Sequence, residues 1–178
     1  MTRLIVCRHA EEGNAAEIQR LAAALAPVLL DAVYTSPLPR ARVTADAVAA
    51  EHELVAIDVR DLREIDFGDV EGVAFDDYPA ELQAALLDRP LAVRFPGGET
   101  YGELQGRVLR ALGEIVSGHP GGTIAVVTHA GPIRAALAVW LGITDAAAFR
   151  LDQRTASVNV VDWLDGAPLI RLVNGTGP

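Results

Sequence analysis

Two histidines stand at matching places in the chain, each directly after an apolar run that predicts a buried strand. His9 follows the run Leu4–Cys7 and one arginine, Arg8, whereas His129 ends the run that starts at Thr123. Ligands of open α/β sheets bind beyond the carboxyl ends of the strands, so both imidazoles are expected in one cleft. A lone strand-end histidine is more often a packing residue, but packing alone does not explain two in the same context. A nucleophilic imidazole beside a permanent cation indicates phosphoryl chemistry.

Further anion-binding groups are predicted at the starts of two helices. The turn at residues 130–132 opens a helix and leaves backbone N–H groups free, that of Ala130 among them, which makes a natural anion site. Arg40 lies in the first turn of a helix that also begins at the end of a strand, so it can face the same cleft. Arg42, two residues further on, is better explained as a solvated side chain.

Cleavage of a phosphate ester also needs a proton donor for the leaving oxygen. The acidic stretch between residues 61 and 72 offers several carboxyl groups, most of them expected to be surface charges. One carboxyl near the phosphate would serve as a general acid, but chemistry alone does not choose among Glu64, Asp66 and Glu71.

Strands and helices alternate along most of the chain. Predicted strands lie at residues 4–7, 32–35, 54–59, 123–128, 157–163 and 169–173. Predicted helices lie at residues 14–25, 37–50, 79–87, 99–117 and 131–141. The longest helix carries an apolar stripe formed by Leu104, Val108, Leu112 and Ile115. This order predicts a single α/β domain over residues 1–178, a three-layer α/β/α sandwich around a mixed, mostly parallel central sheet.

The composition argues against several classes of binding partner. The chain has 178 residues and a net charge of −9, and all 15 of its basic residues are arginine. Such an acidic chain is a poor candidate for binding nucleic acid or a membrane, and no apolar run approaches the roughly 20 residues of a membrane span. The single cysteine and the absence of a signal-peptide pattern predict a cytoplasmic protein. No Cys and His cluster has metal-ligand spacing, so neither a metal nor a cofactor is expected.

Four motifs, in order and over nearly the whole chain, resemble the histidine phosphatase superfamily, the phosphoglycerate-mutase-like group. They are Arg8-His9, residues 35–41 (TSPLPRA), residues 62–72 (LREIDFGDVEG) and residues 128–131 (THAG). Residues 96–100 (PGGET) resemble a turn of the phosphatase branch that includes α-ribazole phosphatase and the broad-specificity phosphatases. Each motif alone is weak evidence, but four in the same order are specific. The resemblance implies the phosphoglycerate-mutase-like fold.

The resemblance also implies a role for each residue that matches a motif. His9 matches the nucleophile that becomes phosphohistidine, and Glu64 matches the proton donor, which settles the choice among the carboxyls. Arg8, Arg40 and His129 match the groups that hold the oxygens of the transferring phosphoryl group. The implied activity is that of a metal-independent phosphomonoesterase acting on a small phosphorylated metabolite.

Three positions near the first motif depart from the family pattern. The family has Gly after the Arg-His pair, where this chain has Ala10, and a small hydroxyl residue where it has Glu12. A methyl group is costly wherever φ is positive, and a carboxylate repels phosphate. Asn14, the match for a phosphate-binding Asn, lies one position out of register. A catalytically weak, phosphate-binding member therefore stays open as an alternative, as does a phosphoglycerate-type mutase.

Substrate choice is expected to depend on residues 78–96 and on the turn Gly97–Glu99. The side chains in these two segments do not by themselves identify a substrate. The oligomeric state is open too, and a homodimer would be unsurprising for this class.

Overall fold

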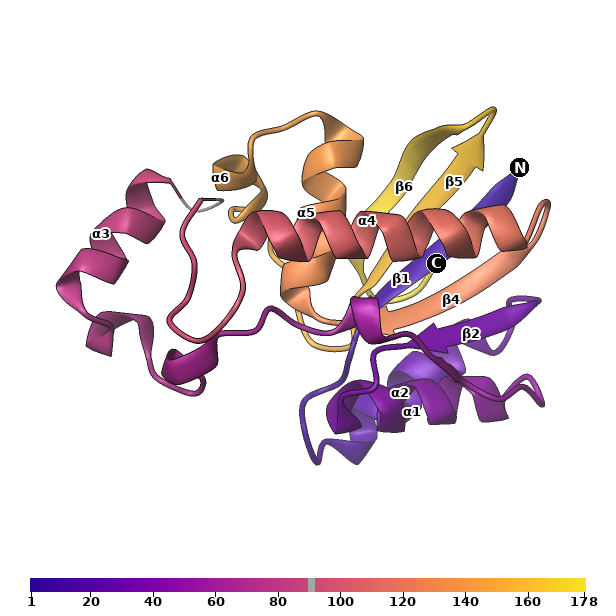
Figure 1. Ribbon diagram of the computed structural model, residues 1–178. Helices are drawn as coiled ribbons and strands as arrows, with labels where there is room; N and C mark the ends of the chain where they lie inside the picture. The colour runs from indigo at the N-terminus through magenta and orange to yellow at the C-terminus, as the bar shows by residue number, and fades with distance from the viewer. Residues whose placement is uncertain (90–91) are drawn as a thin grey trace.

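One central sheet lies between two layers of helices in the computed structural model, which describes residues 1–89 and 92–178 (Figure 1). The strands are β1 (Thr2–Arg8), β2 (Ala32–Thr35), β3 (Ile57–Asp58), β4 (Thr123–Thr128), β5 (Val158–Leu164) and β6 (Ala167–Gly175). They are ordered β3-β2-β4-β1-β5-β6. The first four are mutually parallel, whereas β5 is antiparallel to both of its neighbours. The predicted fold class, with its mixed and mostly parallel sheet, is confirmed.

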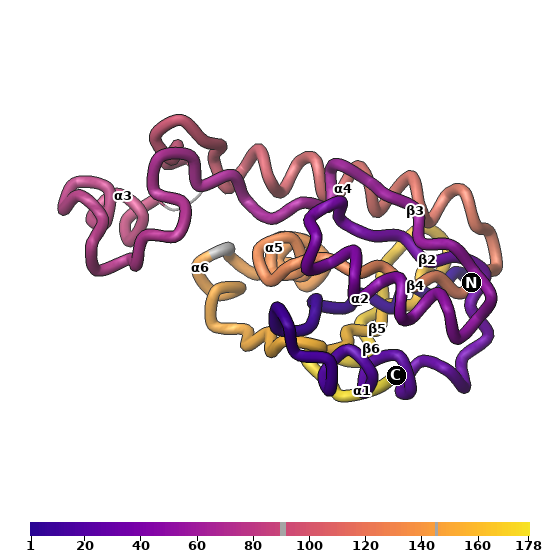
Figure 2. The backbone as a smooth tube through the Cα atoms, turned by 90° about the horizontal axis from the view of Figure 1, so that it is seen from below, coloured from indigo at the N-terminus to yellow at the C-terminus, as the bar shows by residue number. Residues whose placement is uncertain are grey.

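Helices cover both faces of this sheet (Figure 1). The helices are α1 (Ala15–Leu25), α2 (Pro39–Ala50), α3 (Ala80–Asp88), α4 (Tyr101–Gly118), α5 (Ala130–Leu141) and α6 (Asp145–Ala148). Helices α1 and α2 pack together on one face, and α4 and α5 pack together on the other. In both views the segment through α3 extends beyond the end of the sheet (Figures 1 and 2). No helix in the described ranges is long and apolar enough to cross a membrane.

The central strands are apolar on both sides because each side meets a layer of helices. In β1, Leu4 and Val6 face the core under α4 and α5, whereas Ile5 and Cys7 face the core under α1 and α2. All four side chains are fully or almost fully buried. A parallel strand covered on both faces reads as a continuous apolar run, and this is the pattern that precedes each of the two histidines.

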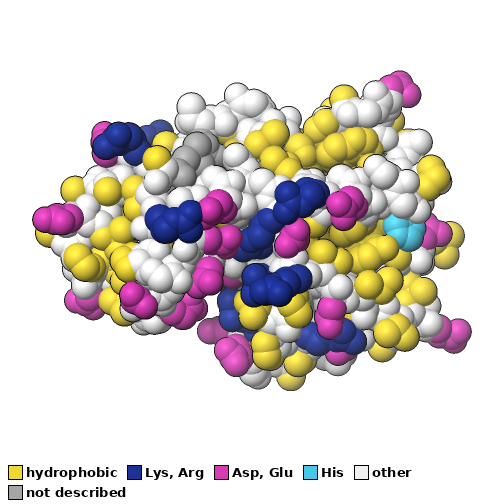
Figure 3. All heavy atoms as spheres, in the orientation of Figure 1, with side chains coloured by type: hydrophobic (Ala, Val, Ile, Leu, Met, Phe, Trp, Pro, Cys, Tyr) yellow, Lys and Arg dark blue, Asp and Glu magenta, His cyan; other side chains and the backbone are white. Residues whose placement is uncertain are grey.

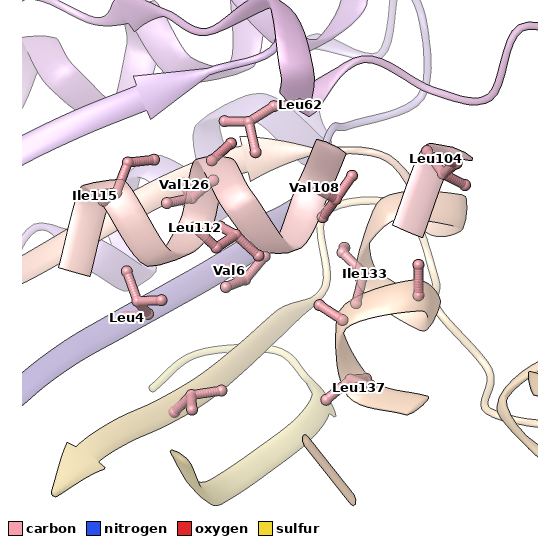
Figure 4. Close-up of a cluster of buried hydrophobic side chains, with 14 of the residues drawn as sticks. Leu4, Val6, Leu62, Leu104, Val108, Leu112, Ile115, Val126, Ile133 and Leu137 are labelled. Atoms are coloured by element: carbon pink, nitrogen blue, oxygen red, sulfur yellow. The ribbon is translucent and has the colours of Figure 1, made fainter. Parts of the chain in front are cut away.

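The apolar stripe predicted on the longest helix forms the centre of one core. Figure 4 shows this buried stripe of α4, formed by Leu104, Val108, Leu112 and Ile115. It packs over Leu4 and Val6 of β1. The helix begins with a capping box in which Thr100 and Glu103 each accept a backbone N–H of the other. This helix start fixes where the preceding Gly-Gly turn lies.

Three local predictions differ from the structure. The strand predicted at 54–59 is paired only at Ile57 and Asp58, because it lies at the edge of the sheet and the chain then turns into a 3₁₀ helix, Arg60–Leu62. The helix predicted from residue 37 starts at Pro39, since Ser36 and Pro37 still belong to the turn out of β2. The short helix α6 was not predicted, because four residues are too few for a periodic signal.

Candidate active site

His9 is held at the carboxyl end of β1 by its backbone and by its ring. Its N–H donates to the carbonyl of Thr128 at the end of β4, at 2.9 Å, so the two strand ends lie side by side (Figure 1). Ring atom Nδ1 lies 2.6 Å from the carbonyl oxygen of Ala10. Because a carbonyl only accepts, Nδ1 carries the proton and Nε2 presents its lone pair. Nε2 accepts a hydrogen bond from Nε of Arg40 at 3.3 Å, so this cation lies at the reactive atom.

The surroundings of His9 keep the imidazole neutral. Burial lowers its pKa most, and the positive charges of Arg40 and Arg8 lower it further, against the opposing effect of the Ala10 carbonyl. A neutral imidazole with a free Nε2 lone pair is the form that can attack phosphorus. The geometry of His9 is therefore that of a nucleophile.

His129 lies beside His9 at the N-cap of α5, and its side chain is fully buried. The two ring centroids are 5.0 Å apart. Burial, together with the nearby His9 and Arg40, lowers the pKa of His129 to about 2, so this ring is neutral as well. Its Nε2 lies 2.8 Å from Oγ of Ser36, whereas Nδ1 is buried without a hydrogen-bond partner in the part of the chain that the structure describes.

Ser36 contacts His129 through a hydroxyl that can donate or accept. The hydroxyl oxygen also accepts the N–H of Leu38 at 3.3 Å. When the hydroxyl donates to Nε2 of His129, the ring proton resides on Nδ1. His129 then offers a buried, unpaired N–H as a donor to an anion. The sequence predicted no role for Ser36 at the site, because a contact over 93 residues leaves no local signal.

Glu64 lies against the first turn of α5. Its carboxylate oxygens accept the backbone N–H of Ile65 at 2.9 Å and that of Gly131 at 3.2 Å. Burial raises the pKa of this carboxyl, and the two N–H groups, Arg40 and Arg8 oppose that rise only in part. A raised pKa favours the protonated form that a general acid needs. A Cβ at position 131 would lie 2.1 Å from Oε1 of Glu64, so the close approach of this carboxyl requires glycine there.

The other two carboxyls are placed differently. Asp66 and Glu71 are exposed, and Asp66 caps the N–H of Gly68 at 3.0 Å. The structure thus brings Glu64, and neither of these two, to the turn that follows His129.

Arg107, which sequence reasoning did not single out, holds the loop that carries Glu64. Its guanidinium donates to the carbonyls of Asp61, Arg63 and Glu64 at 2.7, 2.8 and 2.9 Å. It also forms a largely buried ion pair with Glu99, which accepts the N–H of Asp66 in turn. Glu99 belongs to the Gly-Gly-Glu turn, so this turn helps to hold the loop that carries Glu64. The contact of one guanidinium with three carbonyls joins distant segments of the chain, so no sequence motif predicts it.

The remaining predicted phosphate ligands are placed as follows. Arg40, in the first turn of α2, reaches His9 as described. Arg8 donates from Nη1 to the carbonyl of Gln153, and its Nε is buried with no hydrogen-bond partner among the described residues. Ala130 is the first residue of α5, where a backbone N–H has no partner within the helix. Asn14 is the N-cap of α1, and its side-chain oxygen accepts the N–H of Glu17, so its binding of phosphate stays a prediction.

Ala10 fits its position without strain. Its φ is not among the positive values, its methyl group is buried in the core under α1 and α2, and its N–H donates to Oγ1 of Thr44 at 3.1 Å. The cost expected from replacing Gly here is therefore absent. Glu12 is exposed to solvent, where its charge is screened.

The positive charge at this site comes from arginine. Among residues 1–89 and 92–178, no three His, Cys, Asp or Glu side chains are grouped so that they could hold a metal ion. Arg8 and Arg40 instead supply cations that suit the oxygens of a phosphoryl group.

A family model, described as the histidine phosphatase superfamily (branch 1), matches residues 10–176. The chain belongs to the histidine phosphatase superfamily. The predicted family is thereby confirmed, and relatives of this chain carry phosphatase names. A metal-independent phosphoserine phosphatase of Arabidopsis thaliana is 36% identical over 140 residues, which are 75% of this chain and 57% of that protein. Phosphoserine phosphatase 1 of Hydrogenobacter thermophilus is 28% identical over 99% of this chain and 93% of its own length.

The chain also matches part of a longer relative and superimposes on two solved structures. A bifunctional protein of Mycobacterium tuberculosis is 37% identical over 82% of this chain, but the match spans only 41% of that protein's length. YhfR of Bacillus stearothermophilus superimposes with a TM-score of 0.88 at 24% identity, over 98% of both chains. A phosphoserine phosphatase mutant of Entamoeba histolytica, in complex with phosphoserine, superimposes with a TM-score of 0.87 at 20% identity, over 99% of this chain and 98% of that one. These two structures share the fold described above.

Proposed function

We propose that this histidine phosphatase hydrolyses a small phosphate monoester without a metal, through a phosphohistidine on His9. The observation that carries the proposal is the state of His9: its Nδ1–H is committed to the Ala10 carbonyl, and its Nε2 lone pair faces Arg40. The phosphatase names of the sequence relatives support the same activity.

In the first step, Nε2 of His9 attacks phosphorus, and the bond from phosphorus to the ester oxygen breaks. The leaving alkoxide takes the proton of Glu64, whose raised pKa keeps that proton available. Charge on the three remaining phosphoryl oxygens is met by Arg8, Arg40 and the Nδ1–H of His129. The N–H of Ala130, at the start of α5, adds a further donor.

In the second step, water attacks the phosphorus of phosphohistidine, and the bond from phosphorus to Nε2 breaks. Glu64, now ionised, takes the proton of the water, so the carboxyl is restored for the next cycle. Inorganic phosphate leaves, and His9 is again neutral because its buried surroundings disfavour the imidazolium.

The alternative of a binding-only member rested on Ala10 and Glu12. Ala10 occupies its position without positive φ, so it no longer favours that alternative, whereas the charge of the exposed Glu12 still acts on His9. A location in the cytoplasm stays a prediction supported by the single, buried Cys7. The homodimer likewise stays a prediction.

The test is hydrolysis of p-nitrophenyl phosphate in the presence of EDTA by the wild type and by His9→Ala. The matched control is His52→Ala, which removes a histidine outside the site. We expect turnover by the wild type and the control and none by His9→Ala, with an acid-labile phosphoryl adduct of the wild type detected by mass spectrometry after quenching. Equal turnover by His9→Ala, or none by the folded wild type, would overturn the proposal.

A further inference from the structure

A cavity of about 510 Å³ opens directly beside the carboxyl of Glu64 and the first turn of α5. Glu64, Ala130 and Gly131 line it, so it begins where the proposed mechanism places the leaving oxygen. Cavities of this size hold groups of drug-like dimensions. The cavity is therefore the place for the part of the substrate that departs with that oxygen.

Aromatic rings form much of the cavity wall. They belong to Phe67, Phe75, Tyr78, Phe95, Tyr101 and Phe149. Three of the rings contact one another in sequence, with centroids 5.0 Å apart for Phe67 and Phe95, and 6.4 Å apart for Phe95 and Tyr78. The rings of Tyr101 and Phe149 are 5.1 Å apart. These contacts hold the rings as fixed apolar surfaces.

Large apolar side chains at the mouth of the cavity are open to solvent. Phe75 is 42% exposed, Phe149 is 47% exposed and Leu87, at the end of α3, is 77% exposed. They come from three separate segments of the chain and converge on one cavity. Exposed apolar groups gathered around a cavity mark a binding site more often than a packing defect. Pro90 and Leu91, within the stretch expected to affect specificity, lie outside the described residues.

Few charged side chains line the cavity. Glu64 and Arg134 are the charged residues among its described lining, and Glu64 is already used as the proton donor. Nε of Arg134 donates to the carbonyl of Leu151 at 2.9 Å. The end of the molecule that carries α3 shows hydrophobic side chains with both acidic and basic ones among them (Figure 3). Apart from Glu64, the described lining therefore offers no anion for a cationic leaving group.

We infer that the substrate of this enzyme is the phosphate monoester of a bulky apolar alcohol, aromatic or long-chain aliphatic, whose apolar part fills this cavity. The inference rests on the proposed function and adds to it the class of the leaving group. It separates this chain from its relatives named for phosphoserine, because the described lining of the cavity, apart from Glu64, offers no anion for the ammonium group of an amino acid. Serine would also leave most of the apolar wall in contact with water.

The first experiment measures kcat/KM for ethyl, butyl and hexyl phosphate, with phosphoserine alongside. The three alkyl esters have leaving groups of nearly equal reactivity, so differences report burial of the chain. We expect kcat/KM to rise about threefold to fourfold for each added methylene. A flat or falling series, or a higher kcat/KM for phosphoserine than for hexyl phosphate, would overturn the inference.

Variants of the cavity mouth provide the second measurement. Phe75→Ala and Phe149→Ala should each lower kcat/KM for hexyl phosphate at least fivefold more than kcat/KM for ethyl phosphate. Leu29→Ala is the matched control, because this side chain is 91% exposed and does not line the cavity. Equal losses for both esters would count against a binding role of these rings.

The two proposals fail differently. If His9→Ala abolishes hydrolysis but the alkyl series is flat, the proposed function stands and only the class of substrate is wrong. If no ester is hydrolysed in a manner that depends on His9, the proposed function is wrong and this inference falls with it.

Discussion

The two ends of the active site are built in different ways. At the phosphate end, His9 and His129 are buried, and each has a defined hydrogen-bond partner in the strand ends or in the turn that follows β2. At the leaving-group end, the wall is apolar, and α3 buries none of its residues fully. The groups proposed to act on the phosphate thus lie at the ends of the central strands. The groups proposed to recognise the substrate lie partly on a segment that extends beyond the sheet and can vary without disturbing the core.

Glu64 lies at the boundary between these ends, and its replacement should have the largest effect. Glu64→Gln keeps the shape but removes the proton donor, so kcat/KM for an alkyl phosphate should fall roughly 10²- to 10⁴-fold. The kcat/KM for p-nitrophenyl phosphate should change little, because p-nitrophenolate leaves without protonation. Glu71→Gln, at an exposed position of the same stretch, is the control. Equal losses for both esters would show that Glu64 does not protonate the leaving oxygen.

The carboxyl of Glu64 should also shape the pH dependence of activity. Activity should fall at low pH as His9 becomes protonated, below the ordinary histidine range because its pKa is lowered by burial. Activity should also fall as pH rises through the raised pKa of Glu64, because the proton donor is then lost. In a profile of kcat/KM for hexyl phosphate, Glu64→Gln should abolish the high-pH limb and keep the low-pH limb. Retention of both limbs would assign the high-pH limb to another group.

Replacing Arg40 tests whether the loss of a group at the phosphate end lowers kcat/KM equally for all substrates. Arg40→Ala removes the cation at Nε2 of His9, and kcat/KM should fall about 10²- to 10³-fold for ethyl and hexyl phosphate equally. Arg42→Ala, on the same helix but paired with Asp46 and Asp58 at the surface, should leave activity within twofold. A loss confined to hexyl phosphate would show that phosphate binding and recognition of the leaving group are not separate.

Arg107 connects the two ends through the loop of Glu64, and its loss should affect stability. Arg107→Ala leaves Glu99 without its partner and three carbonyls without their donor, so the free energy of unfolding should fall by about 3 kcal/mol. Arg110→Ala breaks only an exposed pair with Asp61 and should cost less than about 1 kcal/mol. Urea denaturation of both variants checks this difference. Similar losses for both would mean that the loop is held by other contacts.

Ala10 should give the smallest effect, because it lies in the core behind the phosphate end. Ala10→Gly restores the residue usual in the family but removes a buried methyl group and loosens the unfolded chain. We expect a loss of about 0.5 to 1 kcal/mol in unfolding free energy and kcat/KM within twofold of the wild type. A large gain in activity from Ala10→Gly would revive the interpretation that this alanine weakens the enzyme.

Much of the fold was predictable because its signals are local. Strand and helix periods directly predict the continuous apolar runs of β1 and β4 and the stripe from Leu104 to Ile115. The edge strand at Ile57 and the helix start at Pro39 were less predictable, since pairing at an edge and the path of a turn depend on neighbours far along the chain.

The sequence by itself determined that two histidines follow two buried strands and that Arg8 and Arg40 lie near strand ends, because the apolar run of each strand predicts its burial. The chemistry of the residues left Glu64 and its acidic neighbours open, and the family resemblance chose Glu64; the physical reason for that choice, a contact with Gly131 across 67 residues, exists only in the fold. The contact of His129 with Ser36, the contacts of Arg107 with the loop of Glu64 and the aromatic cavity likewise exist only where distant segments meet. Hydrogen bonds and cavities are properties of side chains brought together in space, so the tertiary structure alone decided them.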